Sequence, residues 1–241
     1  MVGRYPCGEA TDRTKLGGFM AKTLFFDIET APNLSYVWGQ WQQDVIEHTR
    51  EWYIICFSYK WEHEKKTHVV SLDDFDLYDK EPENDFDVAY ELWQLLDEAD
   101  IVVGHNSDAF DIKKANARFV YHNFGPTGPY QTVDTLKVAR KYFKFNSNRL
   151  GHLGEHLGLG GKEVTGGFQT WAGCMKGETK AWATMKKYAK QDVDLLVDVY
   201  SKYCVEHNLP LVSADEQDKS ELPHYHVKWI EAFEQLWDLA S

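Results

Sequence analysis

The stretch Leu24-Phe25-Phe26-Asp27-Ile28-Glu29-Thr30 decides the fold, because a short apolar run ends there in two acidic residues. A run of this length and composition predicts a buried β-strand. Side chains alternate between the two faces of a strand, so Asp27 and Glu29 point to the same side. Two neighbouring carboxylates repel each other, which calls for a bound cation or one protonated carboxyl group. Hard oxygen ligands favour Mg²⁺ or Mn²⁺, whereas the alternative interpretation is an exposed acidic strand end.

The segments around this strand predict an α/β fold with a mixed sheet. β-branched and aromatic residues predict a hairpin of two strands over residues 52–61 and 67–72, and a short apolar strand over 101–103. Apolar residues at helical spacing predict three main helices, over residues 85–97, about 109–121 and about 179–205. Shorter helical pieces are expected around Val138 and Tyr142 and over Leu150, Leu153 and Leu157, and the glycine-rich segment 158–167 predicts a mobile loop anchored by Trp171.

The length of 241 residues fits one large domain with appendages. We expect a flexible N-terminal arm over residues 1–20, a main domain over 21–210 and an acidic C-terminal extension over 211–241. No apolar run reaches the roughly 20 residues needed to cross a bilayer, and the N-terminus lacks the order of a signal peptide. The four cysteines are scattered and predict free thiols. Together these features predict a soluble, cytoplasmic protein that does not enter membranes.

The formal net charge of −12 argues against tight binding of duplex nucleic acid over a broad basic face. The middle of the chain departs from this balance, because only Asp134 opposes a run of positive residues after Asp111. That run consists of Lys113, Lys114, Arg118, Lys137, Arg140, Lys141, Lys144 and Arg149. It predicts one patch that meets phosphate, or alternatively a solvated helix face.

Three more polar residues stand where a site could form. Asp111 lies in the first turn of the helix that follows the strand 101–103, where the helix dipole favours a carboxylate or a cap. Tyr188 and Asp192 are four residues apart on the last long helix, so both lie on one face of it. The alternative for each acid is a solvated helix residue.

Taken together, these motifs resemble the DnaQ-like exonucleases of the DEDD superfamily, which have a ribonuclease H-like fold. The resemblance rests on Asp27-x-Glu29, on Asn106-x-x-x-Phe110-Asp111 and on Tyr188-x-x-x-Asp192, and it covers residues 22–205. A tyrosine in the third motif marks the DEDDy branch. Four segments are similar to stand-alone exonucleases of phage and bacteria: 134–136, 148–150, 192–196 and the insert 32–51. For a phage-encoded protein, the expected location is the cytoplasm of the host cell.

The resemblance implies a metal-dependent 3′→5′ exonuclease that acts on single-stranded or frayed DNA ends with two Mg²⁺ or Mn²⁺ ions. Asp27 is expected to bridge both ions, Glu29 and Asp192 to complete the first ion's shell, and Asp111 to serve the second. Tyr188 is expected to orient the attacking water rather than act as base, because a phenol has a pKa near 10. Substrate contacts are expected from Ile28, Thr30, Asn106, Phe110 and Arg149.

Three alternatives to this activity stay open at this point. They are a 3′→5′ exoribonuclease, a structure-specific endonuclease, and a catalytically silent nucleic-acid-binding module on the same fold. The C-terminal extension carries an apolar helical stripe, which predicts packing on its own domain or docking on a replication or repair protein. That stripe consists of Val227, Ile230, Phe233, Leu236 and Trp237.

Overall fold

A mixed β-sheet of five strands forms the centre of the protein, as seen in a computed structural model that describes residues 15–16, 19–41, 44–161 and 167–206. The strands lie in the order β7-β6-β3-β8-β9. β3 pairs antiparallel with β6 and parallel with β8, so the sheet changes character at its central strand. The bounds are β3 Thr23–Thr30, β6 Ile54–Trp61, β7 His68–Ser71, β8 Ile101–Gly104 and β9 Gln131–Asp134.

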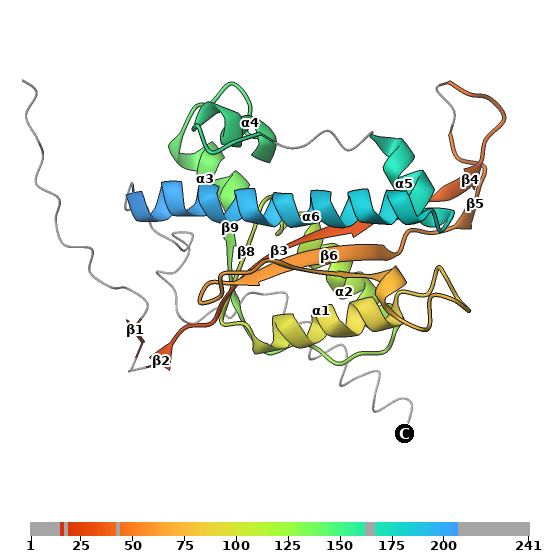
Figure 1. Cartoon of the computed structure of the whole chain (residues 1–241), viewed down its shortest axis with the longest axis horizontal. Coiled ribbons are helices and arrows are strands. Elements are labelled where there is room, and N and C mark those ends of the chain that lie inside the picture. The colour runs from red at the N-terminus through yellow and green to blue at the C-terminus, as the bar shows by residue number, and fades with distance from the viewer. Residues whose placement is uncertain (1–14, 17–18, 42–43, 162–166, 207–241) are drawn as a thin grey trace, which may run out of the picture.

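Helices cover both faces of this sheet (Figure 1). The long helix α6 (Thr179–Tyr200) crosses one face and continues as a π-helix over Ser201–Glu206, while α1 (Phe86–Glu98) and α2 (Asp111–Tyr121) lie on the other. Three shorter helices, α3 (Thr135–Tyr142), α4 (Leu150–His156) and α5 (Phe168–Met175), lie along α6. This arrangement confirms the expected α/β class, a mixed sheet flanked by helices as in the ribonuclease H-like fold.

Successive side chains of β3 point to opposite faces of the sheet, so the strand packs on the helices of both faces. Phe25 faces α6 and packs edge-on against Tyr200, with ring centroids 5.0 Å apart. Leu24 and Phe26 belong to the core cluster that also contains Val88 of α1. Burial of apolar side chains on both faces of β3 is the main favourable term that fixes this strand at the centre.

Most elements expected from the sequence are present, including the hairpin β6–β7 and the helices α1, α2, α3, α4 and α6. The α-helical part of the last helix ends at Tyr200, earlier than expected. Trp171, expected to anchor a loop, lies within helix α5. Strand β9 was not expected, because its sequence Gln-Thr-Val-Asp is short and polar, as an edge strand allows.

Two small hairpins lie outside the main sheet. β1 (Lys15–Leu16) pairs with β2 (Phe19–Met20) inside the segment expected to be a flexible arm. β4 (Leu34–Tyr36) pairs with β5 (Glu47–Arg50) within the insert 32–51, and the segment between them exposes Trp38 and Trp41. The rest of the arm and the C-terminal extension lie outside the described residues, so the domain boundaries stay predictions. Within the described part, no helix is long and apolar enough to cross a membrane.

Candidate metal centre

The carboxyl end of β3 presents Asp27 and Glu29 toward helix α6. Phe25, two residues before Asp27, packs on Tyr200 of α6, so the period of two along a strand turns Asp27 and Glu29 to the same helix. Both acids are partly buried. They therefore lie between the sheet and the helix, where water screens their charges less than on an open surface.

Helix α6 is fastened over this point by a buried hydroxyl of the neighbouring strand. Ser58, which pairs with Asp27 across β3 and β6, donates a hydrogen bond of 2.7 Å to the carbonyl oxygen of Ala189. Ala189 lies on α6 between Tyr188 and Asp192. The bond satisfies a fully buried hydroxyl group. It also fixes the position of α6 relative to β3, and thereby which side chains of the helix face the strand.

Of the acids on α6, Asp192 is the one that faces the sheet. Its side chain is buried, with 3% relative exposure. Asp194 instead accepts a hydrogen bond from Thr67 and pairs with Lys190, and Asp198 is exposed. Asp194 is thus engaged by other residues, and Asp198 faces solvent.

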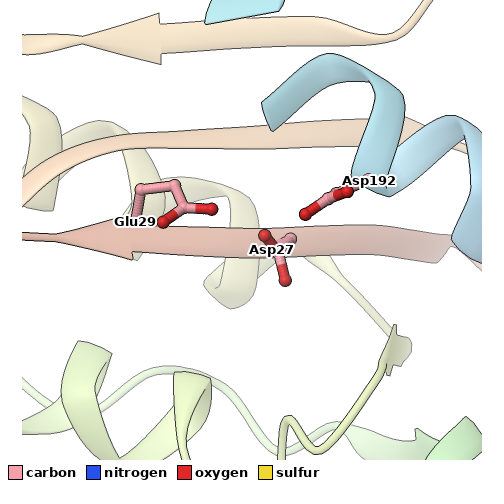
Figure 2. Close-up of side chains that lie close together, drawn as sticks. All are labelled: Asp27, Glu29 and Asp192. Carbon is pink, nitrogen blue, oxygen red and sulfur yellow. The ribbon is translucent and has the colours of Figure 1, made fainter. Parts of the chain in front are cut away.

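Asp27, Glu29 and Asp192 converge on one point (Figure 2). Each offers one carboxylate oxygen, and these three oxygens all lie within 4.8 Å of one another. No other group of three metal-ligating side chains occurs in the described part of the chain. Three hard oxygen donors with a combined negative charge suit a divalent cation such as Mg²⁺ or Mn²⁺, which also offsets their repulsion. The arrangement is therefore a candidate site for a metal ion.

Tyr188 lies at the edge of this cluster, one turn before Asp192. Its hydroxyl group shares a hydrogen bond with the Asp192 carboxylate, and its ring packs edge-on against Trp171 at 5.8 Å. Burial, together with the negative charges of Asp192, Glu29 and Asp27, holds the pKa of Tyr188 above its usual value of 10. The phenol therefore stays protonated at neutral pH and can donate a hydrogen bond but not act as a base.

Asp111 is held beside the cluster by a backbone contact rather than by a helix cap. Its Oδ1 atom accepts a hydrogen bond of 3.1 Å from the amide of Ile28, between Asp27 and Glu29. The pairing of β3 with β8 ends at Phe25 and Val103, which leaves the Ile28 amide to this carboxylate. Burial chiefly, and then the charge of Asp134, raises the pKa of Asp111 to about 6. Asp111 is not a member of the three-carboxylate group.

The expected substrate contacts lie around the same end of the sheet, with different exposures. A bulge between Glu29 and Thr30 shifts the register against β6, and such bulges re-aim side chains. Ile28 is 3% exposed and lies in the core, whereas Phe110 is 40% exposed next to Asp111. Arg149 is exposed and precedes α4. Their roles toward a substrate stay predictions.

Asn106 has a conformational role that the sequence did not indicate. Its φ of 69° lies in the left-handed region, which asparagine tolerates better than most residues. Its amide donates to Asp134 Oδ1 at 2.8 Å, and Asp134 also caps helix α3 through Leu136 and Lys137. The turn that carries β8 into α2 is thus tied to β9, a link that no local motif predicts.

Two residues of the expected basic patch form ion pairs within the protein. Arg118 is buried and binds Asp85, and Lys137 pairs with Asp108. Phe143 and Phe145, which follow α3, pack against the core cluster that contains Phe25 and Tyr200. Among the described residues, His105, His152 and His156 do not join a group of three metal ligands. His105 binds Thr135 and Asn148, and His152 stacks on His156.

No protein-family model matches the chain, and no curated protein matches it in sequence. A solved structure of similar fold is the family B DNA polymerase of the archaeon Pyrobaculum calidifontis. The TM-score is 0.56 at 15% sequence identity, and the match covers 76% of this chain and 24% of the polymerase chain. The chain therefore spans about a quarter of the polymerase, and at this identity the likeness concerns the fold.

Proposed function

We propose that the protein is a metal-dependent 3′→5′ exonuclease that hydrolyses phosphodiester bonds at single-stranded or frayed DNA ends. One observation carries the proposal: Asp27, Glu29 and Asp192 bring three carboxylate oxygens within 4.8 Å at the carboxyl end of the central strand. In open α/β sheets, ligands bind outside the carboxyl ends of strands where the strand order reverses. β3 is that strand here.

The three clustered acids would hold one divalent ion, and Asp27 with Asp111 would hold a second. Bound ions supply Lewis acidity, which activates water and offsets the charge that develops on the phosphate. The donors of this chain fit hard ions, because all are carboxylates. Tyr188 is kept protonated by burial and by Asp192, to which it donates its one O–H. With the Asp192 carboxylate bound to an ion, that O–H would be released to orient the attacking water.

DNA is the first substrate to test, because the fold neighbour is a DNA polymerase. RNA is tested in parallel, since the carboxylates act on the phosphate, whereas discrimination depends on contacts to the 2′-hydroxyl group.

The test is hydrolysis of a 5′-labelled single strand of DNA or RNA with Mg²⁺, Mn²⁺ or a chelator. We expect a ladder that shortens from the 3′ end, lost with the chelator and with Asp27→Asn. Asp198→Asn, an exposed acid on α6, is the matched control and should retain activity. Cleavage of circular single strands would indicate an endonuclease, and wild-type protein that binds but never cleaves would refute the proposal.

A further inference from the structure

Beside the candidate metal centre, a lysine of α2 stacks on a tryptophan. Lys114 Nζ lies 3.4 Å from the centroid of the Trp52 ring and 5.6 Å from that of Phe110. Such cation–aromatic contacts hold the ammonium group in place without neutralising it. Among the residues that the structure describes, Lys114 has no carboxylate partner in an ion pair. Its charge is therefore available to an anion.

Both residues lie at the edge of the sheet where β3 ends. Lys114 follows Asp111 by three residues, which is about 5 Å along a helix. Trp52 precedes β6, whose Ile54 pairs with Thr30, and the Trp52 amide donates to the side chain of Asn33. The pair thus sits next to the candidate metal centre without belonging to it.

The same face of α2 continues away from the centre with Arg118 and Tyr121. The Arg118 guanidinium lies 4.1 Å from the Tyr121 ring centroid and 5.9 Å from that of Trp52. Two hydrogen bonds bind this guanidinium group to the buried Asp85, so its charge is already paired. Arg118 therefore positions the Trp52 and Tyr121 rings rather than binding phosphate. Ten residues separate Asp111 from Tyr121, or about 15 Å of helix, the length of roughly four stacked nucleotides.

Trp52 and Tyr121 line an open pocket of about 740 Å³. Glu51, Glu81 and Glu83 also line it, as do Arg50 and Arg118, whose charges are paired with Glu83 and Asp85. The pocket therefore leaves no free positive charge for phosphate among these lining residues and suits an uncharged aromatic ring, whereas the charge of Lys114, held over Trp52, favours an anion. A nucleotide has these two parts, a flat base and a phosphate.

We propose that Trp52, Lys114 and Tyr121 form a subsite for an upstream nucleotide of a single strand, whose base stacks in the pocket and whose phosphate meets Lys114. This inference rests on the proposed function, because it assumes that the 3′ end of the strand lies at the carboxylates. Stacking on aromatic rings and a cation along the backbone are how proteins bind single strands without sequence preference. The subsite makes affinity depend on strand length.

The first measurement is equilibrium binding, which requires no hydrolysis. A fluorescent oligodeoxythymidylate of about twelve nucleotides is titrated with Ca²⁺ present at several salt concentrations, and binding is followed by anisotropy. Lys114→Gln should weaken binding on the order of ten-fold and reduce the salt slope by about 0.7, the value for one phosphate contact on a single strand. Trp52→Leu should weaken binding similarly while leaving the salt slope unchanged.

The controls separate the subsite from general charge and from folding. Lys66→Gln removes the same charge from an exposed turn at the opposite end of β6, and it should bind as the wild type does. Lys114→Arg should keep the salt slope. Unchanged melting temperatures show that the variants are folded.

The second measurement compares hydrolysis of a dinucleotide, which reaches only the carboxylates, with hydrolysis of the long strand. Lys114→Gln should lower kcat/KM for the long strand alone. Equal effects on both substrates, or binding by Lys114→Gln equal to that by Lys66→Gln, would overturn the subsite. If the wild type hydrolyses neither substrate, the proposed function fails, while the binding titration still decides whether the subsite exists.

Discussion

Replacement of Asp192 by asparagine should stabilise the metal-free protein and remove its response to metal. At 4.8 Å, two carboxylates repel each other by about 3 kcal/mol with an effective dielectric constant near 20. Asp192 faces two such neighbours, but Asp27 and Glu29 are partly exposed and solvent screens them. We therefore expect a net increase of about 1–3 kcal/mol in the free energy of unfolding at pH 8. The amide oxygen still accepts the Tyr188 hydrogen bond, so packing is retained.

The assay is thermal unfolding with chelator and with Mn²⁺. A gain of 1–3 kcal/mol corresponds to roughly 2–12 °C in the melting temperature of a domain of this size. Mn²⁺ at about one hundred times its Kd should stabilise the wild type by about 2.7 kcal/mol and Asp192→Asn far less. Asp198→Asn, exposed on the same helix, is the control for charge removal. The reasoning is refuted if Asp192→Asn destabilises the chelated protein, or if Mn²⁺ stabilises both variants equally.

Three further outcomes test other parts of the structure. Tyr188→Phe should reduce nuclease kcat/KM on the order of 100-fold at unchanged melting temperature, whereas equal activity would remove the hydroxyl from the mechanism. The pKa of Asp111 is raised from 3.8 to about 6 in the folded protein. The free energy of unfolding of the metal-free protein should therefore fall by about 3 kcal/mol as the pH rises from 4 through 6. Urea unfolding measures this loss, and Asp111→Asn should abolish it. Asp85→Ala should cost about 3–5 kcal/mol in the same assay, because it leaves the buried Arg118 without its carboxylate. A cost below 1 kcal/mol would contradict that account.

The sequence predicted those parts of the candidate centre that depend on a local repeat. Asp27 and Glu29 share a face because strand side chains alternate, and Tyr188 and Asp192 share a face because a helix turns every 3.6 residues. Both statements follow from backbone geometry alone. The strands β4 and β5 within the insert and the edge strand β9 were not foreseen, because short strands with polar sequences carry little periodic signal.

The tertiary structure alone decided which of these faces meet. Asp192 reaches β3 because Ser58 binds the Ala189 carbonyl and Phe25 packs on Tyr200, contacts that join segments more than 100 residues apart. The hydrogen bond between Asp111 and the Ile28 amide spans 83 residues and depends on where β8 leaves the sheet. Such pairings follow from strand order and from the packing of whole layers, whose free energy is shared among many side chains. The acids at the end of the apolar run in β3 were therefore readable from the sequence, and their partners were supplied by the fold.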